Sequence, residues 1–421
     1  MLTKQQNDLI TLTGPGTPGG DLMRRYWNPV ALAEELGADE PYAVKVFSED
    51  LVLYRDAAGH PNLIGRYCPH RKVDLSYGRI EAGGLRCVYH GWVMAGDGRC
   101  LEQPGEPAGS SYKDRIRHPA YPCREVGGLI MAYLGPGEPP PLPSFGFFDC
   151  APAQVWSTKI LHACNYLQAN EGNVDPQHLS FLHATLGNNT LNPEFNSLIT
   201  ADVAPKLEVQ ETGYGFRIFA VRKIAPDKNY VRITNFIMPN CSAFDGVPMD
   251  NPQKSPIMPN LGYQVHWHVP IDDRTHWKYT IIYRYEGAID RDFMNNGLFR
   301  EVVATHRSPR NAGNRYMQSR TEMKTTTFAG VGGNFYDQDL LVTETQGDIM
   351  DRSGEHLGST DRPVMLMRKQ MLQAIDDVQR GATPLLASSP EAINDMVVLT
   401  ATVPASTDLF SGWWRQSGGS K

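Results

Sequence analysis

Residues 66–92 of this chain read RYCPHRKVDLSYGRIEAGGLRCVYHGW. The segment contains Cys68-x-His70 and then, after sixteen residues, Cys87-x-x-His90, so two short loops each offer one thiolate and one imidazole. A Rieske [2Fe–2S] centre needs two cysteines on one iron and two histidines on the other. Two such loops supply that set when each gives one ligand to each iron. The spacing therefore predicts a Rieske cluster held by Cys68, His70, Cys87 and His90.

A zinc site of the Cys₂His₂ type has the same ligand set and is the main alternative. Zinc fingers usually pair the two cysteines together and the two histidines together, whereas the two types alternate here. The alternation favours the iron–sulfur cluster. The remaining cysteines are expected to be small apolar core residues; they are Cys100, Cys123, Cys150, Cys164 and Cys241.

The sequence around the two loops predicts a small all-β domain over residues 38–150. Short strand-like runs, such as 43–47 and 51–54, alternate there with glycine-containing turns. The proline-rich segment 135–143 fits neither a core strand nor a helix, so it indicates a linker near the end of this domain. Residues 1–37 are predicted to form an N-terminal lead-in.

Residues 151–421 are predicted to form a second domain of the α+β class. Helical character at 165–186 comes first and several strand-like runs follow, before the last third becomes helical again. Strands gathered between helices predict an antiparallel sheet with helices against it. The runs expected to be strands are 216–221, 230–238, 263–269 and 277–285, and the late helices are expected at 338–345 and 363–380.

A second metal site is indicated by residues 164–187, which read CNYLQANEGNVDPQHLSFLHATLG. Two imidazoles and one carboxylate on one face, with open positions, form the facial triad of non-haem Fe(II) oxygenases. His178 and His183 are the candidate imidazoles. Their five-residue spacing does not suit a regular helix, where residues three or four apart meet. The helix is therefore either distorted, as in a π-bulge, or it ends before His183.

Asp175 allows two interpretations. It precedes Pro176, so it can simply cap the start of a helix. A carboxylate can also bond the free ring nitrogen of a histidine ligand and so orient it. The two roles are compatible.

The carboxylate of the triad should come from a distant part of the sequence. Residues 334–347 read NFYDQDLLVTETQG, and Asp339 lies near the expected start of a helix. We prefer Asp339 as the ligand. The alternative is an ordinary carboxylate favoured by the helix dipole, and the rival ligands are Asp337, Glu344 and Asp348.

Composition and charge exclude several other classes of protein. The chain has 421 residues, 41% of them apolar and 20% charged, with a formal net charge of −6. Basic residues form no cluster, so neither nucleic acid nor an anionic membrane is expected as a partner. No run approaches the ~20 apolar residues of a membrane span, and the N-terminus has no signal-peptide pattern. We expect a cytoplasmic protein, and seven cysteines at irregular spacing argue against a disulfide framework.

With these motifs in place, the chain resembles the α subunits of Rieske ring-hydroxylating oxygenases. It is most similar to the branch with phthalate, 3-chlorobenzoate and phenoxybenzoate dioxygenases and some aryl O-demethylases. The resemblance covers nearly the whole chain. It is carried by LTGPGTPGGDLMRRYW, GLRCVYHGW, CNYLQANEGNVDPQHLSFLH and DRSGEHLGSTD, which begin at residues 12, 84, 164 and 351. Departures are Glu171-Gly172, where many members have Glu-Asn, the polar loop 187–189, and the segment 239–259, which is rich in proline and asparagine.

The resemblance implies a Rieske domain followed by a helix-grip catalytic domain, assembled as homotrimers or stacked hexamers. Each cluster would feed the mononuclear Fe(II) of the next subunit, with Asp175 linking His70 or His90 of one chain to His178 or His183 of its neighbour. A separate flavin and iron–sulfur reductase would supply electrons from NAD(P)H. The chain itself has no GxGxxG-type dinucleotide site, which fits an external donor.

The reaction implied is oxidation of a small aromatic substrate by O₂. We expect cis-dihydroxylation or monooxygenation of an aromatic carboxylate such as a phthalate or substituted benzoate. The alternatives are aryl-ether O-demethylation, or a Rieske electron-transfer protein without oxygenase activity. An aromatic carboxylate calls for a cation in the pocket. Among the cations on or near predicted strands we prefer Arg217 and Arg232; Lys206 and Arg222 are the others, and exposed strand charges are the alternative interpretation. His266 and His268 alternate on one run, so both should point to one face of the sheet and could touch the substrate there.

Overall fold

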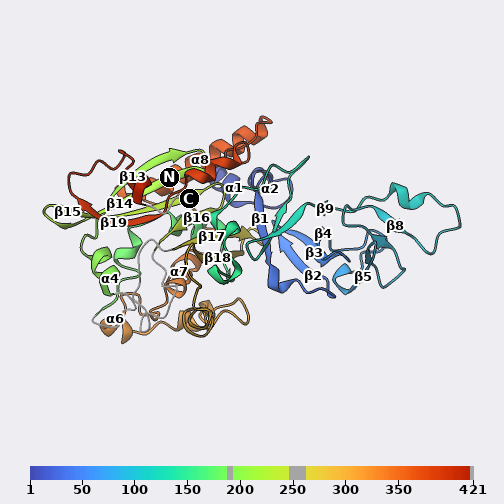
Figure 1. Cartoon of the computed structure of the whole chain (residues 1–421), viewed down its shortest axis with the longest axis horizontal. Helices are drawn as coiled ribbons and strands as arrows, with labels where there is room; N and C mark the ends of the chain where they lie inside the picture. Colours follow the sequence, from blue (N-terminus) through green and yellow to red (C-terminus); the bar gives the residue numbers. More distant parts are fainter. Residues whose placement is uncertain (187–192, 246–261, 418–421) are drawn as a thin grey trace.

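The computed structural model describes residues 1–186, 193–245 and 262–417. The polar loop predicted at 187–189, and most of the segment from 239 to 259, therefore lie outside the described residues. The described chain has an all-β N-terminal part at one end and a larger α+β part at the other (Figure 1). This confirms the predicted fold class and the order of its two parts.

The N-terminal part contains two small antiparallel sheets of four strands each. One has the order β2-β3-β4-β9 and the other the order β5-β6-β7-β8. Some of their apolar residues form a separate small core, which includes Cys68, Cys87 and Trp92. Others, such as Leu51 and Leu53 of β3, belong to the large core of the molecule. The strands are β2 (Tyr42–Val46), β3 (Glu49–Arg55), β4 (Pro61–Gly65), β5 (Arg79–Glu81), β6 (Gly84–Arg86), β7 (Val93–Met94), β8 (Cys100–Glu102) and β9 (Ala120–Tyr121).

A three-stranded sheet joins the two parts of the molecule. It has the order β1-β11-β10, so β1 (Trp27–Leu32) from the lead-in pairs with β11 (Leu129–Tyr133), which pairs with β10 (Cys123–Val126). Every residue of β1 and β11 is buried. One apolar core runs from this sheet into the C-terminal part, so the two parts share packing.

The C-terminal part is built on one antiparallel sheet in the order β12-β18-β17-β16-β15-β14-β13, with β19 paired to β15. All four strand-like runs predicted in this part are strands. The sheet consists of β12 (Val155–His162), β13 (Lys206–Thr212), β14 (Gly215–Ala225), β15 (Lys228–Ile237), β16 (Cys241–Phe244), β17 (Gly262–Pro270), β18 (His276–Arg284) and β19 (Leu399–Pro404).

Helices cover this sheet. The longest, α8 (Arg362–Gln379), packs against β13 and β14 in the manner of a helix-grip fold. It starts with Pro363 in its first turn, where the missing N–H has no cost. The other α-helices of the described chain, not all of which contact the sheet, are α1 (Lys4–Thr11), α2 (Pro18–Arg24), α3 (Tyr166–Asn173), α4 (Pro193–Thr200), α5 (Arg291–Phe293), α6 (Glu322–Thr325), α7 (Phe335–Glu344) and α9 (Trp414–Ser417). No helix of the described chain has the length and apolar content needed to cross a membrane.

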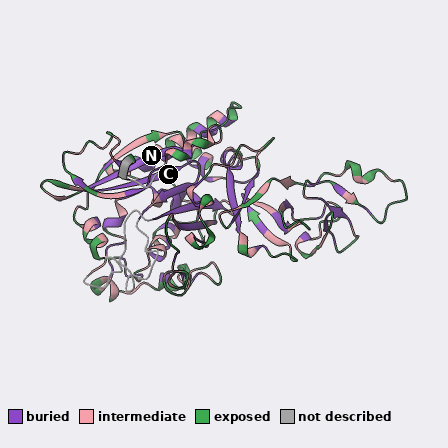
Figure 2. Ribbon diagram, viewed as in Figure 1, coloured by how far each residue is buried: buried purple, intermediate pink, exposed green. Residues whose placement is uncertain are grey.

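The central strands are buried on both faces (Figure 2). Side chains alternate across a strand, so Val265, Trp267 and Val269 of β17 point into the apolar core. His266 and His268 point to the opposite face, towards α3, and the amide of Asn173 contacts a ring nitrogen of each. The prediction that these two histidines share a face is confirmed. One face of the sheet is thus apolar, and the face below α3 carries polar groups.

A buried network of charges holds α3 in place. Glu171 of α3 accepts two hydrogen bonds from the guanidinium of Arg352, at 2.8 and 2.9 Å, and one from Arg368 of α8 at 2.7 Å. Arg368 also pairs with Glu355. Burial raises the pKa of Glu171, but the two arginines outweigh this and hold that pKa below its ordinary value. The network ties α3 to α8 and to the segment that carries Arg352.

Replacing Arg352 by methionine is expected to lower the free energy of unfolding by roughly 3–5 kcal/mol. Removing one member of a buried ion-pair network leaves buried charge poorly compensated. Here Glu171 loses two of its three hydrogen bonds from arginine and keeps only the one from Arg368. Urea denaturation followed by tryptophan fluorescence measures the change. Arg274→Met is the matched control, because Arg274 pairs with Asp348 at the surface and such pairs are worth about 0–1 kcal/mol. Equal shifts for the two variants would contradict the role given to the network.

Candidate active site and metal centres

The two cysteine–histidine loops have the same backbone turn. In each, the cysteine N–H donates to the carbonyl five residues on, and the N–H four residues on donates back to the cysteine carbonyl. These distances are 2.8 and 2.9 Å for Cys68, and 2.9 and 3.0 Å for Cys87. The fourth residue after each cysteine, Lys72 or Gly91, has a positive φ of 59° or 75°. Glycine adopts such a turn without strain, while Lys72 adopts it despite its Cβ.

The loops direct thiols inwards and imidazoles outwards. Cys68 and Cys87 are buried, and burial raises the pKa of the Cys68 thiol to about 11. His70 and His90 are exposed, with their ring centroids 4.5 Å apart. Trp92 stacks on His70 at 4.6 Å and 4°. One pair of ligands therefore lies in the core and the other at the surface, as the two irons of a Rieske cluster require.

A single zinc ion would need all four ligand atoms around one point. Among the described residues, one group of three or more histidine, cysteine or acidic side chains has ligand atoms within 4.8 Å of one another, and it lies elsewhere. The four residues of the two loops do not converge in this way. Their separation into a cysteine pair and a histidine pair fits a two-iron cluster better than zinc.

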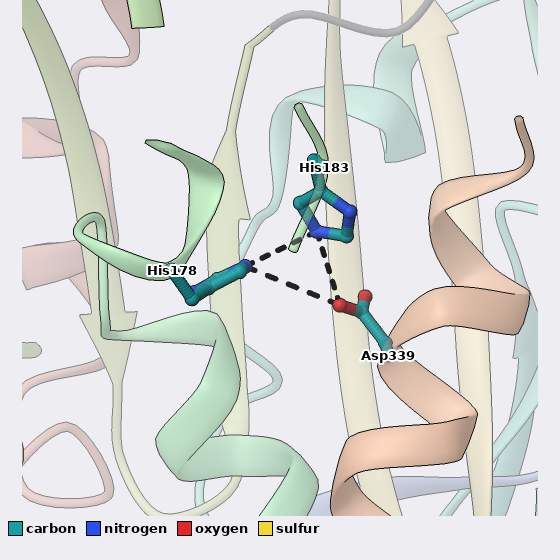
Figure 3. Close-up of side chains that lie close together, drawn as sticks. All are labelled: His178, His183 and Asp339. Carbon is teal, nitrogen blue, oxygen red and sulfur yellow. Dashed lines mark hydrogen bonds and ion pairs between the residues drawn. The ribbon is translucent and has the colours of Figure 1, made fainter. Parts of the chain in front are cut away.

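The converging group consists of His178, His183 and Asp339 (Figure 3). The two Nε2 atoms lie 3.2 Å apart, and Asp339 Oδ1 lies 3.1 Å from His183 Nε2 and 4.0 Å from His178 Nε2. The helix α3 ends at Asn173, and His178 begins a short 3₁₀ turn that ends at Ser180. Of the two explanations for the five-residue spacing, the second is correct, because His183 lies beyond the end of the helical turn.

The contacts of the Nδ1 atoms of His178 and His183 determine which ring nitrogen of each imidazole carries the proton. The amide nitrogen of Gln338 donates to the Gly332 carbonyl at 2.7 Å, so its oxygen faces His183 Nδ1, also at 2.7 Å. That oxygen can only accept, so Nδ1 carries the proton and Nε2 presents a lone pair. His178 Nδ1 faces Asp175 Oδ2 at 3.5 Å, which favours the same tautomer.

Two imidazole lone pairs and a carboxylate oxygen at these distances repel one another unless a cation lies between them. The donor set, two neutral imidazoles and one carboxylate, is that of the non-haem iron facial triad. The three residues therefore fit a mononuclear metal ion. The rivals for the carboxylate position lie elsewhere. Asp337 bonds Ser308 and Arg310, Glu344 bonds Ala163 N and Tyr316, and Asp348 pairs with Arg274.

Asp175 has both of the arrangements considered for it. Its Oδ1 accepts from the backbone N–H of Gln177 at 2.8 Å, which caps the turn, while Oδ2 faces His178. Burial raises the pKa of Asp175, but His178 outweighs this and holds it below its ordinary value. Burial lowers the pKa of His178, and Asp175 more than reverses that shift. The Asp175 side chain is 23% exposed, so a group from outside can reach it.

A cavity of about 460 Å³ opens onto the triad. This volume is within the ordinary range of small-molecule pockets. The triad and Asp175 lie on its wall together with the polar groups of Asn173, Gln264 and His266. Its apolar walls come from Leu179, Phe195, Ile199, Phe244, Phe293, Leu298, Phe335 and Tyr336.

Of the two arginines predicted to bind substrate, Arg232 lines the cavity. Its Nη2 donates to the Asp245 carbonyl at 2.7 Å and its guanidinium lies 5.2 Å above the Phe195 ring. The prediction for Arg217 is wrong. Arg217 is fully buried away from the cavity, stacked 4.1 Å over the Trp414 ring and bonded to Gln210 and to the Asp395 carbonyl. Neighbouring residues of β14 point to opposite faces, and Arg217 points to the face that the C-terminal segment covers.

Several residues around the site were not found from the sequence. Phe335 stacks on the His183 ring at 4.2 Å, and Gln338 orients that ring. Arg222, named only as a strand cation, donates to the Pro176 carbonyl at 2.7 Å and so supports the turn before His178. Lys278 contacts Asp339. The role of Gln338 could have been inferred, because it directly precedes Asp339 in the sequence. The contact of Lys278 with Asp339 could not, because it depends on strand register and no local sequence pattern indicates it.

Comparison with known proteins identifies both parts of the chain. Residues 26–119 match the model of the Rieske [2Fe–2S] domain, and residues 132–420 match the model described as LigXa C-terminal domain like. The phthalate 4,5-dioxygenase oxygenase subunit of Pseudomonas putida is 36% identical over 412 residues, covering 91% of this chain and 89% of that protein. The 5,5′-dehydrodivanillate O-demethylase oxygenase subunit of Sphingobium sp. is 32% identical, with 95% and 86% covered.

Solved structures agree on the fold. A variant of the carbazole 1,9a-dioxygenase oxygenase, in its complex with ferredoxin, has a TM-score of 0.59 at 18% identity, and the match covers 93% of this chain and 96% of that chain. At this identity the likeness concerns the fold alone. The match extends over both parts of the chain described here.

Proposed function

This chain belongs to the Rieske oxygenases whose catalytic domain is of the LigXa C-terminal type, and from that premise we propose that it oxidises an aromatic carboxylate. Cys68, His70, Cys87 and His90 would bind the [2Fe–2S] cluster. His178, His183 and Asp339 would bind one Fe(II). The observation that carries this proposal is the convergence of two imidazole lone pairs and a carboxylate at the floor of one apolar cavity.

Fe(II) bound at the triad would supply the activation of O₂, with electrons from the cluster. The chain's own side chains would do the rest. Gln338 accepts from Nδ1 of His183, and Asp175 faces Nδ1 of His178. Both contacts hold the proton of the imidazole on Nδ1, so that each Nε2 atom stays free to bind the metal. The aromatic walls of the cavity would hold a planar ring and keep bulk water away from the reacting face.

Arg232 is proposed to bind the substrate carboxylate. It is the one lysine or arginine on the cavity wall among the residues that the structure describes. The side chain is buried, and its Nε has no hydrogen-bond partner in the described chain. A buried guanidinium with an unused donor is stabilised by an anionic ligand, because a carboxylate supplies both the acceptor and the countercharge. The similarity to a phthalate dioxygenase subunit supports this substrate class.

Replacing Arg232 by methionine is expected to raise KM for aromatic carboxylates roughly 10- to 100-fold, since a charge-assisted hydrogen bond contributes about 1.5–3 kcal/mol. Steady-state kinetics with a benzoate and with its uncharged methyl ester measures the effect. The ester should show little change between wild type and variant. Arg217→Met is the matched control, as a buried arginine of the neighbouring strand that does not reach the cavity. An unchanged KM for the acid in Arg232→Met would exclude this anchor.

Electrons are proposed to pass between subunits of a homotrimer or stacked hexamer. The sheet with β5 and β8, next to the Rieske loops, lies at the far end of the molecule from α7, which carries Asp339 (Figure 1). That separation argues against transfer within one chain. His70 and His90 are exposed, and so is part of Asp175, which suits contact between the cluster of one subunit and His178 of the next. A flavin and iron–sulfur reductase would be the electron source. A cytoplasmic location is part of the same proposal, and seven free cysteines fit a reducing compartment.

Iron content and turnover of anaerobically purified protein test the proposed function. About three irons per chain, a reduced Rieske EPR signal and oxygen-dependent product from phthalate or a substituted benzoate would support it. About two irons per chain, not increased by added Fe(II), would indicate an electron carrier instead. Release of formaldehyde from methoxybenzoates, without hydroxylation of phthalate or benzoates, would favour the O-demethylase alternative.

A further inference from the structure

We propose that Lys278 is a positioning residue that holds Oδ2 of Asp339 away from the metal, so that the carboxylate ligates through Oδ1 alone. One coordination position would then stay free for the reactants. The inference rests on the proposed function, since it requires Fe(II) at His178, His183 and Asp339.

The two oxygens of Asp339 have different partners. Oδ1 lies 3.1 Å from His183 Nε2 and faces the point where the ligand atoms converge. Oδ2 lies 3.5 Å from the ammonium of Lys278. A carboxylate with one oxygen engaged by a cation and the other aimed at the metal is biased towards binding through a single oxygen, because turning to bind with both would break the ion pair.

Lys278 lies where a lysine is rarely found. Its side chain is 1% exposed, and lysine is almost never fully buried unless it is paired. Asp339 is the acidic partner found for it within the described chain, and the Tyr336 ring lies 5.0 Å from its Nζ. The lysine therefore gives up its hydration to contact one carboxylate, and that carboxylate is the proposed iron ligand.

The sheet fixes the position of this ammonium. Lys278 is the third residue of β18, opposite His268 of β17 on one side and Ile160 of β12 on the other. Asp339 is on α7, which lies on the same face of the sheet as the triad. The paired strands on both sides fix the backbone of Lys278, and burial restricts the movement of its side chain. The ammonium is therefore restrained from following a carboxylate that rotates.

If Lys278 holds Asp339 in single-oxygen coordination, its loss should change Fe(II) affinity in the opposite direction from the loss of a residue that only supports the structure. Losing an outer partner of a metal ligand normally weakens metal binding 10- to 100-fold, because the ligand loses its orientation. Losing Lys278 should do the opposite. It removes a positive charge from beside the metal and releases a second oxygen to bind it, so affinity should rise.

Lys278→Met in the full-length protein, with the cluster loaded and oxidised, tests this. Competition with a chelator should give an Fe(II) dissociation constant about tenfold lower than in wild type. Lys278→Arg, which keeps the charge and a donor, should retain the wild-type constant. Lys159→Met is the matched control. Lys159 is equally buried on the neighbouring strand β12 but pairs with Glu35, 2.6 Å away, so the variant should leave Fe(II) affinity unchanged.

A spectroscopic measurement tests directly whether Asp339 binds the metal through one oxygen. Its first result comes from the wild-type protein and so does not depend on whether a variant folds. The nitric oxide adduct of the Fe(II) site has an EPR signal, whereas the oxidised cluster has none, so the mononuclear site can be observed alone. Electron–nuclear double resonance in ¹⁷O-labelled water then detects the exchangeable water ligands of that iron. Wild-type protein should retain a second exchangeable water beside nitric oxide, and Lys278→Met should retain one fewer. A wild type with a single exchangeable water, or weaker Fe(II) binding in Lys278→Met, would overturn the role of Lys278. Failure of the wild type to bind Fe(II) at all would instead overturn the proposed function.

Discussion

Replacing His178 by alanine is expected to lower the rate of substrate oxidation at least about thousandfold while leaving the Rieske cluster intact. A bound metal typically contributes several kcal/mol to lowering the barrier, and each 1.36 kcal/mol is a factor of ten. His178 would supply one of the three proposed protein ligands, and its Nε2 lies 3.2 Å from that of His183. Without it, Fe(II) would be held by His183 and Asp339 alone.

Two measurements on the His178→Ala variant, together with one control variant, separate loss of the mononuclear site from general damage. Iron analysis should fall from about three to about two atoms per chain. The EPR signal of the reduced cluster should be unchanged, because Cys68 and Cys87 belong to another core. His60→Ala, at a side chain 78% exposed in the N-terminal part, is the control and should keep full activity. A variant that loses one iron but still oxidises substrate at the wild-type rate would remove His178 from the catalytic site.

Replacing Asp175 by asparagine is expected to lower the rate of substrate oxidation roughly hundredfold while both metal sites stay loaded. A carboxylate that orients a histidine ligand contributes 10- to 100-fold to activity, and loss of the proposed electron path between subunits would add to that. Asparagine has the same shape and its amide oxygen can still cap Gln177, so the turn should persist. The lost feature is the charge that faces His178 Nδ1.

Rapid mixing of pre-reduced Asp175→Asn protein with substrate and O₂ gives the rate of cluster oxidation directly. That rate should fall with turnover, while iron content stays at the wild-type value. Asp290→Asn is the matched control, since Asp290 caps α5 by accepting from Phe293 N at 2.9 Å and is no part of the proposed site. If cluster oxidation in Asp175→Asn matches that in Asp290→Asn and wild type, Asp175 is a cap and not a link.

The two variants also distinguish the halves of the proposal. His178→Ala tests whether a metal ion at the cavity does the chemistry. Asp175→Asn tests whether electrons reach that metal through the side chain that His178 contacts. A protein that acted only as an electron carrier would keep its cluster potential and its reduction rate in both variants.

Short sequence spacings were enough to single out the cysteines and histidines of both proposed metal sites, because these residues come from local turns. The loops after Cys68 and Cys87 close within five residues through their own backbone hydrogen bonds. His178 and His183 come from one turn and the segment just beyond it. Asp339 was a weaker prediction. Its distance from the histidines in sequence left three other acidic residues open, and only the packing of α7 beside α3 brings it to them.

The substrate end of the site was less predictable, because it depends on the register of long strands. Arg217 and Arg232 read alike in the sequence, as single cations in apolar strands. The sheet brings Arg232 to the cavity and Arg217 under Trp414. Which face of a strand is covered by which segment depends on residues more than a hundred positions away.

The sequence by itself determined the class of fold, the order of the two parts and the chemistry of both sets of proposed metal ligands, since turns, caps and ligand spacings are local properties. Tertiary structure alone decided which carboxylate closes the triad, which arginine reaches the cavity, and that Lys278 lies against Asp339. Those three outcomes follow from strand pairing and helix packing. Strand pairing and helix packing depend on the burial of many apolar side chains from the whole chain. A short segment of the sequence therefore cannot determine either of them.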